Sequence, residues 1–215
     1  AYIADDVTKL YTAEKVEKKT KLIIGQHGGH MGTSPFAYHE EHQIKISDIW
    51  LSWGWEDRKR PKIRSFGNFR TSGRVVDHDP KGGVLMVEAT VPRYSYQMMA
   101  EVISSQWLYY FKDQIDFLKA IPSDLQKRII VRLFPYDYGC DQMDRWVDSG
   151  LDVKFEIGNQ DIISSLQKSR LCISTYNSTT FLETLSWNIP TIMFWIPDYW
   201  ELNSQAKPYF QKLIN

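Results

Sequence analysis

Short apolar runs alternate with segments of helical periodicity along the chain. Several of the runs are continuously apolar, which is typical of strands that are covered on both faces, as in a parallel sheet. Eight runs predict strands, at residues 21–25, 48–53, 62–67, 83–90, 128–134, 152–157, 170–175 and 191–196. Strands that alternate with helical patterns indicate an α/β fold with a Rossmann-like parallel sheet.

Two of the intervening segments predict crossover helices. Six apolar residues recur at steps of three and four and draw one stripe along a helix that ends before Pro122: Met99, Ile103, Trp107, Phe111, Ile115 and Leu118. Residues 160–169, QDIISSLQKS, predict a second helix. Packing against the sheet explains such a stripe better than a cofactor role does.

One polar segment interrupts this regular alternation. Residues 67–83, GNFRTSGRVVDHDPKGG, are rich in glycine and charge and separate two sets of strands, which is typical of an interdomain hinge. We therefore expect a domain up to residue 66 and a second Rossmann-like unit from residue 84 to residue 215. Two such units would direct the carboxyl ends of their strands toward a shared ligand.

Composition narrows the class of protein. The 215 residues include 26 Lys and Arg against 26 Asp and Glu, so no overall charge favours nucleic acid or an anionic membrane as the partner. The hydrophobic content of 43% is enough for a proper core. Two cysteines suit a reducing compartment, and no apolar run approaches the length of a membrane span, so we expect a cytoplasmic protein.

The stretch STYNSTTFLETLSWNIPTIMFW, residues 174–195, places small polar residues between a strand and a helix. In a βαβ unit this turn lies at the carboxyl end of a strand and the amino end of a helix, where free backbone N–H groups favour an anion. The alternative is a capping box, in which Glu183 returns to the backbone of Thr180. We expect the cap to be Asn177 or Ser178, because a helix starting at Thr180 would have barely two turns before Asn188 and Pro190.

A second cluster, VRLFPYDYGCDQMDRW, begins near the end of the strand at 128–134 and continues into a loop. Arg132 lies near the end of that strand, and arginine is suited to bidentate phosphate contacts. The loop beyond it holds Tyr136, Tyr138 and Asp141, and aromatic rings can stack on a base. An ordinary surface loop with a solvated salt bridge is the alternative.

A third cluster, GQHGGHMGTSPFAYHEEH, follows the first strand. Its glycines allow close backbone approach, and His27 could act as a general base, although a packed or solvated histidine is the usual case. The spacing of His39 and His42 does not fit a zincin, so we predict no metal site here. The sequence Asp77-His78-Asp79 resembles a short acidic motif by which some transferases hold a divalent metal, and chance matches to it are frequent.

These clusters carry a resemblance to a known family. The segments QHGGHMGT, VPRYSY, VRLFPYDYG and STYNSTTFLETLSWNIPTIMFW resemble the bacterial surface-carbohydrate transferases of O-antigen and related polysaccharide gene clusters, whose architecture is similar to that of GT-B glycosyltransferases. The resemblance extends from about Lys21 to Phe210. Members of that family are longer, so we expect residues 1–66 to be the C-terminal part of the acceptor-side domain, 67–83 the hinge and 84–215 the nucleotide-sugar-binding domain.

The resemblance implies transfer of a sugar from a nucleotide-activated donor to a carbohydrate or lipid-linked acceptor, at the inner face of the cytoplasmic membrane. It implies no cofactor and no metal, since the nucleotide-sugar is the substrate. Arg132 would neutralise the leaving-group phosphate. The donor would also be held by Asn177, Ser178, Thr179, Thr180 and, at its ribose, Glu183. His27 would be the general base. His30, Tyr138 and Asp141 would contact the acceptor or the nucleotide base.

Two other functions fit the same architecture. A nucleotide-sugar epimerase would form product without any acceptor. A non-catalytic carbohydrate- or protein-binding module would bind glycan without releasing a nucleotide. The residues do not indicate the donor sugar, the nucleotide base, the stereochemical outcome or the oligomeric state.

Overall fold

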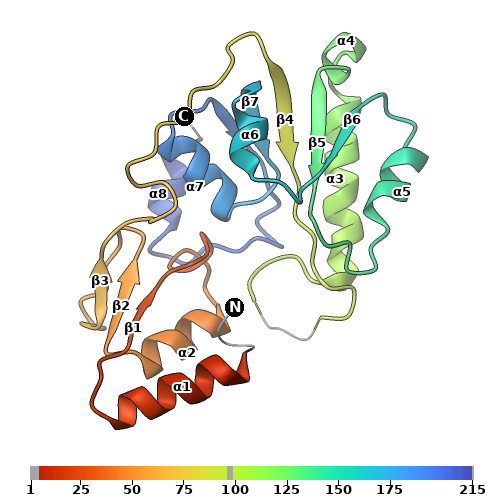
Figure 1. Cartoon of the computed structure of the whole chain (residues 1–215). Helices are drawn as coiled ribbons and strands as arrows, with labels where there is room; N and C mark the ends of the chain where they lie inside the picture. The colour runs from red at the N-terminus through yellow and green to blue at the C-terminus, as the bar shows by residue number, and fades with distance from the viewer. Residues whose placement is uncertain (1–4, 96–98, 215) are drawn as a thin grey trace. The chain divides into compact units, whose positions relative to one another are not determined.

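The computed structural model describes residues 5–95 and 99–214 (Figure 1). It divides into two compact units. Unit 1 contains the described residues up to His27 together with Ala37–Ser72, and unit 2 contains Gly28–Phe36 and the described residues from Gly73 onward. The boundary between Ser72 and Gly73 lies inside the polar segment 67–83, and whether that segment acts as a hinge stays a prediction.

Unit 1 is built on a small parallel sheet. Its described strands are β1 (Ile23–Gly25), β2 (Ile49–Ser52) and β3 (Ile63–Ser65), in the order β1-β2-β3. Helix α2 (Tyr38–Ile46) precedes β2, and the indole N–H of the fully buried Trp50 on β2 donates to Gln43 Oε1 on α2 at 3.2 Å. Helix α1 (Asp6–Glu17) buries none of its residues.

Unit 2 is built on a larger sheet in which every strand pair is parallel among the residues that the structure describes. The strand order is β6-β5-β4-β7-β8. The strands are β4 (Gly83–Val87), β5 (Ile129–Leu133), β6 (Lys154–Ile157), β7 (Ser169–Ser174) and β8 (Thr191–Met193). The α/β class and the Rossmann-like parallel arrangement are thereby confirmed, and so are all eight predicted strands.

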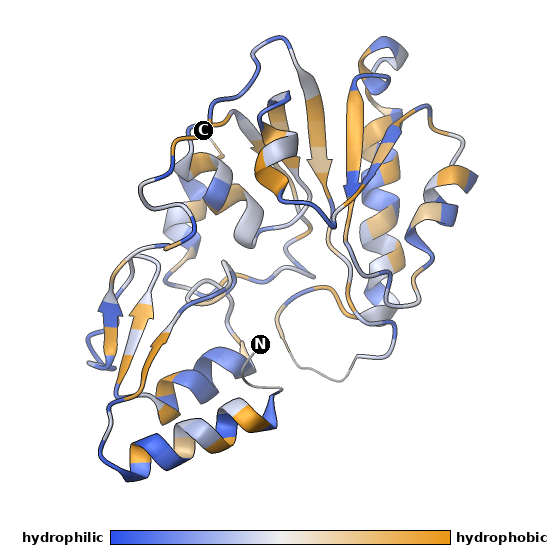
Figure 2. Ribbon diagram, in the orientation of Figure 1, coloured by the Kyte–Doolittle hydropathy of each residue, from blue (hydrophilic) through white to orange (hydrophobic). Residues whose placement is uncertain are grey.

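Alternate residues of β4 serve two separate cores. Val84 and Met86 pack with helix α3 (Trp107–Lys119) and helix α5 (Gln142–Asp148), whereas Leu85 and Val87 pack on the side of α6 (Ile162–Leu166). Figure 2 shows hydrophobic colouring along much of β4 and β5. A strand covered on both faces is apolar at nearly every position, which is why these runs were recognisable. The remaining helices of the unit are η2 (Ser104–Gln106), α4 (Ser123–Gln126), α7 (Thr179–Ser186) and α8 (Lys207–Gln211).

The start of the long crossover helix differs from the sequence prediction. Met99 and Ile103 continue the apolar stripe, but η2 begins only at Ser104 and α3 at Trp107. The backbone of Ile103 is extended, with φ −105° and ψ 168°, and its N–H donates to Gln106 Oε1 at 3.0 Å. The side chain of Gln106 thus fixes where the helix begins. The end at Lys119, before Pro122, and the helix within 160–169 are confirmed.

The topology of unit 2 identifies one edge of its sheet as the place for a ligand. From β4 the chain continues to β5 and β6 on one side and then crosses to β7 and β8 on the other. In open parallel sheets, ligands bind at the carboxyl ends of the strands next to such a reversal. The loops that follow β4, β5 and β7 therefore contain the residues of interest.

Candidate functional site

The turn between β7 and α7 leaves the first N–H groups of the helix without a side-chain cap. Ser178 is the N-cap residue of α7, and its side chain makes no capping hydrogen bond. The predicted early cap is confirmed, and Glu183 lies too far into the helix to complete a capping box with Thr180. Unsatisfied N–H groups and the positive end of the helix dipole make this turn a candidate anion site.

Side chains of the same turn hold its shape. The Thr175 hydroxyl donates to the Val87 carbonyl at 2.9 Å, and the Ser174 hydroxyl donates to the Tyr176 carbonyl at 2.9 Å. The Asn177 amide donates to the carbonyl of Trp200 at 3.1 Å. The Asn177 amide is therefore used to fix the turn, whereas the backbone N–H groups at the start of α7 receive no side-chain cap.

A glycine-rich loop of unit 2 lies directly against this turn. The N–H of Gly29 donates to Thr179 Oγ1 at 3.1 Å. A Cβ atom on Gly29 would lie 2.6 Å from the carbonyl group of Ser178 and 2.8 Å from Thr179 N, so no larger residue fits without displacement. Two of the three clusters singled out in the sequence, 150 residues apart, thus meet at the amino end of α7.

Asn203 fastens that glycine-rich loop, and the sequence analysis did not identify it. Its amide Nδ2 donates to the carbonyls of Gly32 at 3.0 Å and Ser34 at 3.3 Å, and its backbone N–H donates to the Thr33 carbonyl at 2.8 Å. Its Oδ1 accepts the N–H of Ala206 at 2.8 Å, just before α8. An asparagine three residues ahead of the N-cap of a helix is a local capping signal, but the loop that it holds is distant in sequence.

Glu183 lies on α7 and is only 5% exposed. Its carboxylate therefore does not project into open solvent. The assignment of this residue to a ribose hydroxyl stays a prediction.

Arg132 is engaged by neighbouring groups of unit 2. Register pairs it with Glu156 on β6, and its guanidinium, 7% exposed, forms an ion pair with that carboxylate. It also donates to the hydroxyl of Ser165 at 3.3 Å and to the carbonyl of Gln160. The strand end brings Arg132 to the expected edge of the sheet, but its charge is largely used within the fold.

A polar cavity of about 360 Å³ adjoins this ion pair. Glu156, Asn159, Gln160, Ser164, Ser165 and Lys168 line it together with Ile130 and Ile157. Its carboxylate, amide, hydroxyl and ammonium groups can all bond to a polar ligand.

His27 follows β1 in unit 1 and has its imidazole close to that of His39. The two ring centroids are 6.3 Å apart, edge to face. Removal of solvent lowers the pKa of His27 from its ordinary value of 6.5, and the same cause, with the nearby His27, lowers the pKa of His39. A lowered pKa keeps His27 neutral at pH 7, as a proton acceptor must be. His30 belongs to unit 2, and its ring packs over the position that a Cβ atom of Gly28 would take.

Tyr138 and Asp141 lie in the loop between β5 and α5. Both have left-handed backbone conformations, with φ of 55° and 54°, and both are exposed. Asp141 is the N-cap residue of α5 but makes no side-chain capping bond.

A buried carboxyl group that the sequence analysis missed lies directly after β4, the central strand of the larger sheet. Glu88 follows β4, is 2% exposed and accepts the indole N–H of Trp146 on one oxygen at 3.0 Å. Its other oxygen has no hydrogen-bond partner within the described ranges. Burial raises the pKa of Glu88 to about 8, so it carries a proton at pH 7. A glutamate at the end of an apolar strand was the available signal.

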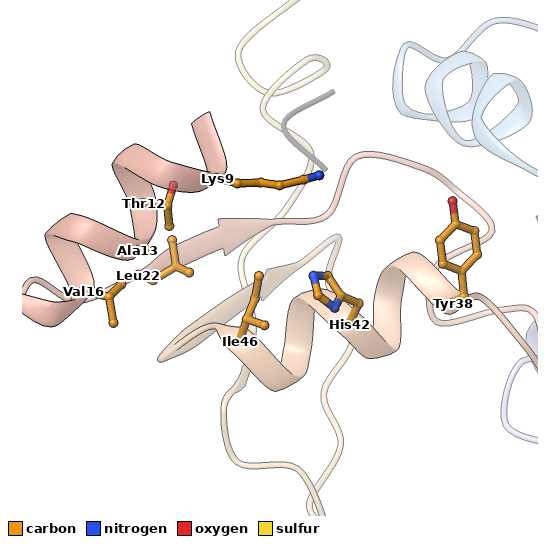
Figure 3. A pocket seen from close by; sticks show the side chains of 8 residues that line it. All are labelled: Lys9, Thr12, Ala13, Val16, Leu22, Tyr38, His42 and Ile46. Carbon is orange, nitrogen blue, oxygen red and sulfur yellow. The ribbon is translucent and has the colours of Figure 1, made fainter. Parts of the chain in front are cut away.

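Unit 1 contains an apolar cavity of about 580 Å³ between its two helices (Figure 3). Lys9, Thr12, Ala13 and Val16 line it from α1, and Tyr38, His42 and Ile46 line it from α2, with Leu22 beside them. This volume lies within the usual range for small-molecule pockets.

Two structural features are absent from the described part of the chain. No group of three or more His, Cys, Asp or Glu residues there is arranged to hold a metal ion. In the acidic motif at 77–79, Asp79 Oδ1 accepts the N–H of Lys81 at 2.9 Å and so stabilises its own turn. Among the same residues, no helix is both long enough and apolar enough to cross a membrane.

Comparisons with known proteins identify a family and a distant structural similarity. The family described as LIC12162 family transferase matches residues 1–215. A comparison with curated proteins finds no match. Among solved structures, the crystal structure of accessory secretory protein 1, 2 and 3 in Streptococcus pneumoniae is similar at 13% identity and a TM-score of 0.41. That similarity covers 91% of this chain, which spans only 45% of the length of the other.

Proposed function

We propose, because the chain belongs to the LIC12162 family of transferases, that it takes part in moving a sugar from a nucleotide-activated donor to a carbohydrate or lipid-linked acceptor. The four segments that resemble surface-carbohydrate transferases support this reaction and its place in bacterial surface polysaccharide synthesis. A lipid-linked acceptor would bring the enzyme to the inner face of the cytoplasmic membrane. Membership of a transferase family favours transfer over epimerisation.

The observation that carries the proposal is the uncapped amino end of α7. Its N-cap Ser178 makes no side-chain bond, and the Gly28–Phe36 loop packs against the turn at Gly29. The donor diphosphate would bind the backbone N–H groups of Ser178, Thr179 and Thr180, where the helix dipole stabilises negative charge. Glu183 would contact the ribose, as the resemblance implies.

The leaving group of this reaction is a nucleoside diphosphate, whose charge increases as the bond to the sugar breaks. Fixed N–H dipoles at a helix terminus stabilise such charge without reorganisation. We assign the neutralisation to the α7 terminus and not to Arg132, because Glu156 already pairs with that guanidinium.

His27 would take the proton of the acceptor hydroxyl. The hydroxyl oxygen then bonds to the anomeric carbon while the bond from that carbon to the diphosphate breaks. The lowered pKa of His27 keeps the imidazole unprotonated near pH 7. His30, Tyr138 and Asp141 would contact the acceptor.

The Ser178→Asp variant tests the anion site while leaving the helix capped. Aspartate is a good N-cap, so the melting temperature should be maintained, but its negative charge should weaken binding of UDP, GDP, CDP or dTDP at least about tenfold. Ser178→Asn is the matched control, because it caps equally well and has almost the same shape without the charge. Equal nucleotide binding by both variants would refute the site.

A second measurement separates transfer from the alternative functions. The protein is incubated with a nucleotide-sugar, with and without an acceptor glycan, and free nucleotide is quantified. Acceptor-dependent release supports transfer. Conversion of the sugar without acceptor would identify an epimerase, and glycan binding without release would identify a binding module.

A further inference from the structure

The loop after β5 displays aromatic rings at the carboxyl edge of the larger sheet. We call residues 134–142 the aromatic loop. Its three rings lie close together, with centroid distances of 6.4 Å between Phe134 and Tyr136, 6.0 Å between Phe134 and Tyr138, and 5.9 Å between Tyr136 and Tyr138. Tyr136 is 65% exposed and Tyr138 is 45% exposed. Large exposed rings that gather on one loop indicate a binding surface more strongly than scattered ones do.

Asp137 fixes the backbone that carries these rings. Its Oδ2 accepts the N–H groups of Gly139 and Asp141, both at 3.0 Å, and its Oδ1 accepts the N–H of Gln142 at 2.7 Å. These bonds hold the left-handed conformations of Tyr138, Gly139 and Asp141. A non-glycine residue in that region is uncommon, so the fold maintains this geometry against its intrinsic cost.

The side chain of Gln142 bonds to the backbone at the start of the aromatic loop. It is 3% exposed, its Oε1 accepts the N–H of Phe134 at 3.2 Å, and its Nε2 donates to the carbonyls of Phe134 at 3.4 Å and Tyr136 at 3.2 Å. The N–H of Arg93 also donates to the Tyr138 carbonyl at 3.2 Å. The rings are thus presented on a backbone that has little freedom to lose when a ligand binds.

Charge limits which ligand this surface can take. Residues 134–148 contain four aspartates, at 137, 141, 144 and 148, against the arginine at 145. Arg93 adds a second guanidinium, whose Nη1 donates to the Gly139 carbonyl at 3.4 Å, so carboxylates are still in excess. Excess carboxylate repels a nucleotide or a phosphate, but carboxylates accept hydrogen bonds from sugar hydroxyls. The apolar faces of aromatic rings suit the C–H face of a pyranose.

We propose that Tyr136 and Tyr138 form a stacking platform for an uncharged pyranose ring of the acceptor. The acceptor role rests on the proposed function, whereas the binding of a pyranose is independent of it. The platform follows β5, which lies two strands from β7 in the sheet order, roughly 10 Å away at normal strand spacing. This distance is compatible with one saccharide between the platform and the donor site.

Saturation-transfer NMR with the methyl glycopyranosides of glucose, galactose and mannose tests the platform. Saturation of the aromatic protons should reach the C–H protons of at least one probe. Affinity should fall at least about threefold in Tyr136→Ala and Tyr138→Ala, since an aromatic contact is lost. Tyr138→Phe should bind as the wild type does, because the ring face is retained. Tyr209→Ala, on the exposed α8, is the matched control and should change nothing.

Three results would each overturn the platform. They are no transfer to any of the three probes, undiminished binding in the double variant Tyr136→Ala/Tyr138→Ala, and loss of binding in Tyr138→Phe. Melting temperatures of the variants show that the fold is intact. Nucleotide binding is measured on the same samples. Sugar binding without nucleotide binding would refute the donor site alone, and the converse would refute the platform alone.

Discussion

Two loops at the carboxyl edge of the larger sheet differ in whether a side chain accepts hydrogen bonds from their backbone N–H groups. In the loop after β5, the Asp137 carboxylate accepts three of them. In the turn after β7, the N-cap Ser178 contributes no side-chain acceptor to α7. A side chain thus satisfies donors of the first loop, whereas no side chain caps those at the start of α7.

The surroundings of the two loops differ in the same sense. The aromatic loop is acidic and exposes Tyr136 and Tyr138, which suits a neutral ring. The turn at Ser178 is made of small residues and receives the close approach of Gly29, which suits a compact anion. The two loops share their position at the sheet edge but differ in local acceptors and charges, and for that reason we expect different ligands at the two places.

Replacing Arg132 by Met would test whether nucleotide binding at the proposed anion site needs this cation. Loss of the guanidinium leaves Glu156 without its partner, and breaking a largely buried ion pair costs about 3–5 kcal/mol in the free energy of unfolding. We expect this loss in urea unfolding together with unchanged nucleotide affinity of the folded protein. The double variant Arg132→Met/Glu156→Leu should regain most of the stability. A large fall in nucleotide affinity would restore Arg132 to the donor site.

Glu88 lies at the end of β4, between the two loops, and should make stability depend on pH. Because burial raises its pKa to about 8 from the ordinary 4.5, its favourable contribution is complete below pH 4.5 and is lost as the pH rises through 8. Across that window wild-type stability should fall by up to about 1.4 kcal/mol per pH unit relative to Glu88→Gln, which stays neutral. Urea unfolding of both proteins from pH 5 to 8.5 measures this difference, and parallel curves would show that Glu88 is ionised in the folded state.

Much of the fold could be predicted from local patterns because the strands of the larger sheet are buried on both faces. Such strands are apolar at nearly every position, so runs like 83–90 and 128–134 stand out. The predicted start of the α3 helix was wrong because the apolar stripe continues through Met99 and Ile103, while the side chain of Gln106 sets the actual beginning. Periodicity reports which residues are apolar and does not report where a helix is capped.

The site was less predictable because its contacts depend on register and on distant segments. Arg132 looked available until pairing of β5 with β6 placed Glu156 beside it. Gly29 and Ser178 were both singled out, but nothing local indicated their contact. Asn203 was missed because two of the carbonyls that it holds, those of Gly32 and Ser34, lie about 170 residues earlier. The N-cap position at Ser178 agrees with the prediction, although α7, with its eight residues, is itself barely two turns long.

Gly29→Ala should lower both stability and nucleotide affinity, because Gly29 packs against the Ser178 turn from a different loop. The added methyl group would lie 2.6 Å from the Ser178 carbonyl, so the loop or the turn must move, at a cost of about 1–3 kcal/mol. Thermal unfolding and nucleotide titration should both show the loss. Gly25→Ala is the control, since its nearest neighbour would be Phe69 Cε2 at 3.9 Å. Unchanged nucleotide affinity in Gly29→Ala would mean that the loop is only a neighbour of the site.

Asn203→Asp should have the smallest effect on stability of these variants. It separates the two roles of the side chain, which holds the Gly28–Phe36 loop and accepts the Ala206 N–H before α8. The carboxylate can still accept the Ala206 N–H, but it can no longer donate to the carbonyls of Gly32 and Ser34, which it would now repel. We expect a loss of about 1–2 kcal/mol in the free energy of unfolding. Hydrogen exchange should rise in Gly28–Phe36 and stay constant at Lys207–Gln211, because the cap is kept. The aromatic loop should keep its saccharide binding in this variant, whereas nucleotide binding should weaken. If both activities fell together, the two loops would not be the independent sites that their opposite chemistry predicts.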